Sequence, residues 1–131
     1  MGAKLTYSGD VQALAVERSS VDGIDFVAVE GEIDIATSPR LIPVLNQAVS
    51  DGAGPLIVDL SRVGFMDSTG LGLLINAKRR VDRRGNGFAV VCPPGPLYRV
   101  FEVTDMVGIL GVSTDREGAI AAVARPRARF T

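Results

Sequence analysis

Positions 67–70 place an acidic residue, two hydroxyl residues and a glycine together, as Asp67, Ser68, Thr69 and Gly70, directly before an apolar helical repeat. The first N–H groups of a helix lack backbone partners and favour negative charge. A phosphoryl group on Ser68 could therefore be accepted at this helix start without unfolding the helix. Asp, Ser and Thr are also common N-cap residues, and from the spacing alone a simple cap is the favoured interpretation.

Two other stretches are predicted to lie near this loop. Residues 31–34, Gly-Glu-Ile-Asp, and residues 93–95, Pro-Pro-Gly, each follow a predicted strand. Loops that leave the C-terminal ends of parallel strands gather at one edge of a sheet, so we expect all three loops to meet there. Phe65 and Met66 are large apolar residues in the connection before Asp67, and we expect them to anchor that connection to the core.

The residues that the chain lacks limit its chemistry. It contains no histidine and a single cysteine, Cys92. Ser–His and Cys–His nucleophile pairs are therefore impossible, and the commonest general base is missing. The spacing of a zinc site is absent, and Ile75 stands where a dinucleotide fingerprint needs its third glycine. We expect a protein without catalytic activity, metal or cofactor, in which Cys92 is a small buried hydrophobe.

Strands that alternate with helices must position these residues. Asp22-Gly23 is a strong hairpin signal, so the first two strands should run antiparallel. Ser38 suits the N-cap of a first helix and Pro39 its first position, and Thr114 and Glu117 have capping-box spacing before a last helix. Weak alternation of apolar and polar residues predicts a strand at residues 11–17. Further strands are predicted at residues 25–31, 56–60, 88–92 and 109–112.

The resulting order is β-β-α-β-α-β-α-β-α. It predicts an α/β fold with a mixed, mostly parallel sheet of about five strands and helices packed on it. All 131 residues are expected to form a single domain, with a core over about 11–123 and a flexible tail at 125–131.

The single cysteine and the hydropathy pattern favour a cytoplasmic protein. The net charge of −1 gives no general attraction to nucleic acid or to an anionic membrane. The basic cluster at 78–84 is interrupted by Asp82 and suits a helix C-terminus. No apolar run is long enough to span a bilayer, and the first ten residues lack the apolar core of a signal peptide.

The stretch Val58-Asp59-Leu60, followed by Phe65-Met66-Asp67-Ser68-Thr69-Gly70-Leu71-Gly72, closely resembles the signature of the anti-sigma factor antagonists, which are STAS domains. Residues 31–34 resemble the second marked motif of that family, at a fitting distance upstream. The predicted order of elements also matches the family, and the resemblance runs from about residue 11 to residue 123.

This resemblance implies partner switching. In the family, the unphosphorylated protein binds an anti-sigma factor and so frees a sigma factor. The anti-sigma factor is usually a serine kinase that itself binds ATP and Mg²⁺, and its phosphorylation of the serine, here Ser68, ends the complex. A separate PP2C-type phosphatase restores the active form. By resemblance, Asp34, Asp67, Ser68, Thr69 and Gly70 form the partner-binding site, and Thr69 is a less favoured acceptor than Ser68.

Two alternatives remain open. A STAS domain could serve as a scaffold or regulatory subunit of a larger complex, and phosphorylation of Ser68 would distinguish the two functions. A receiver-like phosphoaspartate switch could use Asp59 as its acceptor, but that chemistry needs an acidic pair after the first strand, where only Glu17 is present.

Overall fold

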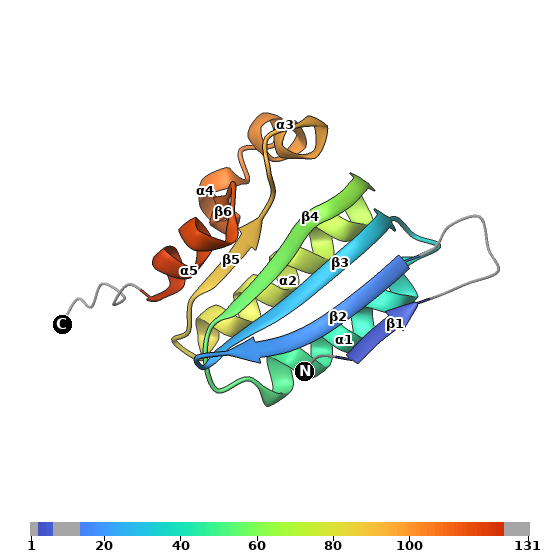
Figure 1. Ribbon diagram of the computed structural model, residues 1–131. Coiled ribbons are helices and arrows are strands. Elements are labelled where there is room, and N and C mark those ends of the chain that lie inside the picture. The colour runs from blue at the N-terminus through green and yellow to red at the C-terminus, as the bar shows by residue number, and fades with distance from the viewer. Residues whose placement is uncertain (1–2, 7–13, 125–131) are drawn as a thin grey trace.

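The computed structural model describes residues 3–6 and 14–124, which form one mixed β-sheet with helices on both faces (Figure 1). The described strands lie in the sheet in their sequence order. β1, β2 and β3 pair antiparallel with one another in turn, whereas β3 to β6 run parallel. The strands are β1 (Ala3–Thr6), β2 (Leu14–Val21), β3 (Ile24–Ile33), β4 (Leu56–Met66), β5 (Phe88–Val91) and β6 (Val112–Ser113).

This architecture confirms the predicted fold class, a mixed and mostly parallel α/β sheet. The edge strand β1 is an addition that the sequence patterns did not predict. Residues 11–13 of the first predicted strand and the predicted tail at 125–131 lie outside the described residues.

Helices pack on the two faces of the sheet unequally. α1 and α2 cover one face along most of its length, and α5 covers part of the other face (Figure 1). None of the helices in the described ranges is long and apolar enough to cross a bilayer. The helices are α1 (Ser38–Asp51), α2 (Ser68–Arg83), α3 (Pro96–Val103), α4 (Val107–Leu110) and α5 (Arg116–Ala124).

The central parallel strands divide their side chains between two cores, because successive residues of a strand point to opposite faces. Val27 and Val58 belong to the larger core, which contains the apolar sides of α1 and α2. Phe26 and Ile57 belong to a smaller core under α5. The buried run at the start of β4 therefore reflects cover on both faces, as expected for a parallel strand.

The hairpin between β2 and β3 forms where the sequence predicted it. Asp22 and Gly23 both have positive φ, 52° and 81°, which is the backbone of a two-residue turn that matches the twist of the strands. The strands run on past their predicted ends, because every residue from Leu14 to Val21 has a partner in β3.

β4 is longer than predicted and does not stop at Leu60. The pairing of β4 with β3 continues past two irregularities in register and ends where Ile33 lies opposite Met66. Phe65 and Met66 are therefore strand residues, not part of a loop. Met66 is buried, as expected for an anchor, but the Phe65 side chain is 50% exposed, so the expectation that it anchors to the core was wrong.

The predicted strand at 109–112 was also wrong in part. Residues 107–110 form the short helix α4, which ends at Gly111 in the left-handed conformation, φ 66°, and only then does β6 begin. Two predicted helix starts shift by one residue. Thr37, not Ser38, is the N-cap of α1, and Asp115, not Thr114, accepts the Gly118 N–H at the start of α5.

Candidate functional site

The ends of β3 and β4 bring two of the three predicted loops together. Ile33 lies opposite Met66, and the Asp67 N–H donates to the Ile33 carbonyl oxygen at 3.1 Å. The loop that begins at Asp34 and the helix start at Ser68 are therefore neighbours at the carboxyl ends of β3 and β4. The third loop, residues 93–95, leaves β5 after Val91, which pairs with Asp59 well before the end of β4, so the register does not align it with the other two.

Asp67 is the N-cap of α2. Its Oδ1 accepts the backbone N–H of Thr69 at 2.8 Å and that of Gly70 at 3.4 Å. Its extended backbone, with φ −96° and ψ −170°, is the usual conformation of a cap residue. The cap that the sequence left open among three residues thus belongs to Asp67.

Ser68 is left free of the capping role. It is the first residue of α2 and is exposed to solvent. Within the described part of the chain its hydroxyl has no hydrogen-bond partner. Thr69, one position later, is only partly exposed. Of the two hydroxyls, that of Ser68 is the more accessible to a second protein.

Gly70 lets the helix start pack closely on the strands. A Cβ atom at this position would lie 2.8 Å from Met66 Sδ and 2.9 Å from Ile33 Cγ2, which is closer than such atoms approach. Gly70 is buried, and its lack of a side chain permits this close packing.

Asp34 organises the neighbouring loop. Its Oδ1 accepts the N–H groups of Ala36 at 2.9 Å and of Thr37 at 3.0 Å. The buried Thr37 hydroxyl donates to the Glu32 carbonyl oxygen at 2.7 Å and accepts the Asp34 N–H at 3.0 Å. Thr37 was not among the predicted site residues; a threonine three residues after an aspartate is the pattern that could have indicated it.

Exposed apolar side chains accompany the two loops. Ile35 is 77% exposed directly after Asp34, and the half-exposed Phe65 stands two residues before Asp67. Single apolar side chains at a protein surface are ordinary. Two large apolar side chains beside acidic residues, at the carboxyl ends of neighbouring strands, are typical of a protein-binding surface. We call this edge the strand-end surface; it comprises Asp34, Ile35, Phe65, Asp67 and Ser68.

The other residues considered from the sequence have structural surroundings. Burial raises the pKa of the Cys92 thiol to about 11, and the nearby Asp59 carboxylate adds to that rise, so the thiol is neutral at physiological pH. At the C-terminal end of α2, Lys78 pairs with Asp82, and Arg84 donates to the Gly52 carbonyl oxygen at 3.0 Å. No cluster of potential metal ligands occurs in the described ranges.

Comparison with known proteins shows which family this chain belongs to. The model of the STAS domain matches residues 15–119. The "Anti-sigma-B factor antagonist" of Staphylococcus aureus strain NCTC 8325 is 31% identical over 104 residues, which cover 79% of this chain and 96% of that protein. An anti-sigma factor antagonist from Mycobacterium paratuberculosis, known from its crystal structure, is 28% identical with a TM-score of 0.80, covering 86% of this chain and 95% of that chain.

The unphosphorylated form of the anti-sigma factor antagonist SpoIIAA superposes with a TM-score of 0.68 at 19% identity, over 86% of this chain and 99% of that chain, which supports the fold. The mixed sheet and its helices are those of a STAS fold. The chain belongs to the STAS domain family, among the anti-sigma factor antagonists.

The family and the topology argue against the receiver-like alternative. A receiver of the flavodoxin-like type has strand order 2-1-3-4-5, whereas the strands here follow sequence order. Asp59, its would-be acceptor, is buried and bound to Arg116 and Ser61.

Proposed function

We propose that this protein is a phosphorylation-controlled anti-sigma factor antagonist that acts in the cytoplasm. Its unphosphorylated form binds an anti-sigma factor through the strand-end surface and so frees a sigma factor. The anti-sigma factor, acting as a serine kinase with its own ATP and Mg²⁺, phosphorylates Ser68 and the complex dissociates. A PP2C-type phosphatase then removes the phosphate. The observation that carries the proposal is the exposed Ser68 hydroxyl at the first position of α2, beside a cap that Asp67 already provides.

The names of known relatives support the antagonist part of this proposal. The staphylococcal proteins that match most of this chain are named anti-sigma-B factor antagonists. The mycobacterial structural neighbour is named, more generally, an anti-sigma factor antagonist. In this proposal the chain acts by binding and as a kinase substrate, with no turnover of its own.

The chemistry of the strand-end surface suits a switch based on charge. Ile35 and Phe65 offer apolar area that a partner would remove from water. A phosphate on Ser68 would add roughly −1.5 to −2 charges beside Asp67 and Asp34. The helix dipole compensates an exposed charge by only about 0.3–1 kcal/mol, whereas burying an unpaired charge costs several. Phosphorylation should therefore leave the fold intact and weaken the complex.

The first test identifies the acceptor. The purified chain is incubated with its candidate anti-sigma factor, ATP and Mg²⁺, and the product is mapped by mass spectrometry. We expect phosphate on Ser68 in the parent and in Thr69→Ala, and none in Ser68→Ala. Phosphate that still enters Ser68→Ala would refute Ser68 as the switch.

The second test measures the consequence by calorimetry with the same partner. Ser68→Ala should bind like the parent, and Ser68→Glu at least tenfold more weakly, a factor that corresponds to about 1.4 kcal/mol. Equal affinities for parent, Ser68→Ala and Ser68→Glu would favour the scaffold function that the sequence left open.

A further inference from the structure

The face of the sheet opposite α1 and α2 is covered only in part. α5 packs its buried Ala119 and Val123 over the half of this face that carries Phe26 and Ile57. Farther along β3 the same face carries Ala28, where the small core ends. Parallel strands are usually covered on both faces, so the uncovered half of β3 and β4 departs from that general pattern.

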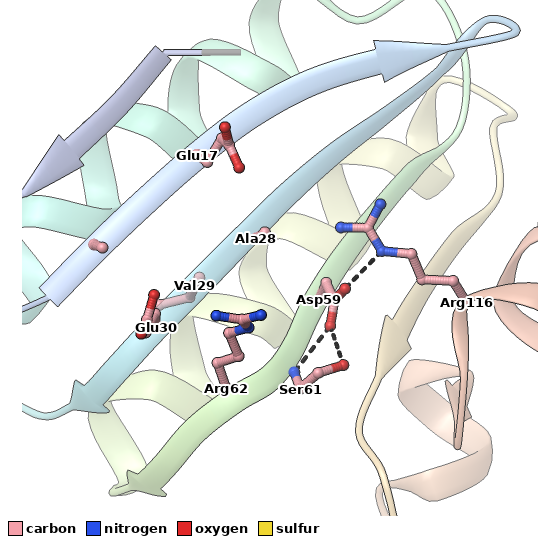
Figure 2. Close-up of a pocket in the computed structure, with 9 residues that line it drawn as sticks. Glu17, Ala28, Val29, Glu30, Asp59, Ser61, Arg62 and Arg116 are labelled. Atoms are coloured by element: carbon pink, nitrogen blue, oxygen red, sulfur yellow. Dashed lines mark hydrogen bonds and ion pairs between the residues drawn. The ribbon is translucent and has the colours of Figure 1, made fainter. Parts of the chain in front are cut away.

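A hollow of about 340 Å³ occupies this uncovered half. Its floor is made by small side chains, and its walls carry charged groups from three strands and α5 (Figure 2). Its volume falls at the lower end of the range for small-molecule sites. The charged side chains that line it are Glu17, Glu30, Asp59, Arg62 and Arg116.

Asp59 fixes one of the two guanidinium groups. This aspartate is only 8% exposed, and its Oδ2 accepts Arg116 Nε at 2.7 Å, while its Oδ1 accepts the Ser61 N–H at 2.9 Å and the Ser61 hydroxyl at 2.5 Å. The Arg116 guanidinium also lies 4.7 Å from the centre of the Phe26 ring. Its Nε is thus engaged and its position is held from two sides.

The remaining donors of both arginines face the hollow. An arginine carries five N–H donors, and the two terminal nitrogens of Arg116 extend away from Asp59 over the sheet (Figure 2). The Arg62 guanidinium lies on the other side of Asp59, above β3 (Figure 2), and has no ion pair within the described residues. Two guanidinium groups that flank one hollow are suited to bind a carboxylate or phosphate.

The opposite wall selects against a purely anionic ligand. Glu17 stands on β2, two strands away from β4, and would repel a second negative charge but attract a cation. Two inter-strand spacings are about 10 Å, and the side chains that reach inward shorten the gap between the charged ends. We propose that this hollow binds a small zwitterion, with its oxyanion between Arg62 and Arg116 and its cationic group toward Glu17.

The test uses three five-carbon probes that differ only in their end groups: 5-aminopentanoate, glutarate and 1,5-diaminopentane. Each is titrated into the isotope-labelled full chain at low salt, up to about 10 mM, which detects affinities well into the millimolar range. We expect saturable amide shifts for 5-aminopentanoate, grouped at the residues lining the hollow, and at least tenfold weaker binding of the other two.

Single charge removals locate the site. Arg62→Gln and Glu17→Gln should each weaken the binding of 5-aminopentanoate at least tenfold. Arg79→Gln on α2 and Glu102→Gln on α3 remove the same charges from exposed positions outside the hollow and should change it less than twofold. These four positions are not buried, so the variants should fold.

Three results would overturn the proposal: no saturable shift with 5-aminopentanoate, glutarate binding as tightly as 5-aminopentanoate, or unchanged binding by Arg62→Gln. The measurement needs neither a partner protein nor phosphorylation, so its outcome is independent of the function proposed for Ser68.

Discussion

Two glycines in α2, only two positions apart, should respond oppositely to the same substitution. A methyl group at Gly72 would meet no atom within 4 Å, whereas at Gly70 it would meet Met66 and Ile33 at less than 3.0 Å. Alanine is favoured over glycine in an exposed helix by about 0.5–1 kcal/mol. Gly72→Ala should therefore raise the free energy of unfolding by roughly that amount.

At Gly70 the same gain in helix propensity is opposed by overpacking. Forcing a methyl group into a packed site costs about 1–3 kcal/mol, because neighbouring side chains leave their preferred rotamers. Ile33 is fully buried and β-branched and the Met66 atoms concerned lie within the core, so neither neighbour can move cheaply. Gly70→Ala should therefore be about 1–3 kcal/mol less stable than Gly72→Ala.

Urea denaturation of parent, Gly70→Ala and Gly72→Ala measures both effects. For a chain of this size, 1 kcal/mol corresponds to about 3–5 °C in Tm, so a thermal scan provides an independent check. If Gly70→Ala proved as stable as Gly72→Ala, the close packing between the start of α2 and the ends of β3 and β4 would be refuted.

Two further predictions concern the strand-end surface and the Asp59–Arg116 ion pair. Ile35→Ser should weaken anti-sigma factor binding at least tenfold, as measured by calorimetry. Val21 is also an exposed apolar residue but lies at the opposite end of the sheet, so Val21→Ser should leave the affinity unchanged. Equal effects of the two substitutions would show that Ile35 is not in the interface. Although burial acts to raise the pKa of Asp59, hydrogen bonds from Ser61 and Arg116 hold that pKa below its ordinary value. The stabilisation from ionised Asp59 is thus present above the unfolded pKa of about 4 and is lost as pH falls through the lower folded pKa. In urea titrations, the difference in free energy of unfolding between parent and Arg116→Gln should therefore shrink in acid. A difference that stays constant with pH would contradict this.

Short sequence patterns predicted the turns and strands whose formation depends on neighbouring residues in the chain. Asp22-Gly23 forms the expected hairpin, and the apolar run at 56–60 forms the start of the expected buried strand. The continuation of β4 to Met66 could not be seen, because it depends on pairing with β3 across irregularities in register and not on its own alternation. The hydroxyl and acidic pattern at 67–69 located the helix start, but only coordinates could assign the cap to Asp67.

The hollow was still harder to predict, because its charged residues come from four elements far apart in the sequence. Asp59 lies within an apolar run and Arg116 follows it by 57 positions, and nothing in either neighbourhood indicates the other. Burial of Asp59 next to a smaller core becomes evident only once α5 is placed on the sheet.

The capping role of Asp67 bears directly on how the proposed switch works. Its Oδ1 already accepts the N–H groups of Thr69 and Gly70, which are the donors a phosphate at the start of α2 would otherwise use. A phosphate on Ser68 would therefore gain little beyond the weak attraction of the helix dipole, and it would stand beside a carboxylate that cannot move away without uncapping the helix. In this proposal the new charge neither reorganises the loop nor finds an internal partner. It remains at the surface, where it acts on whatever protein must bury it.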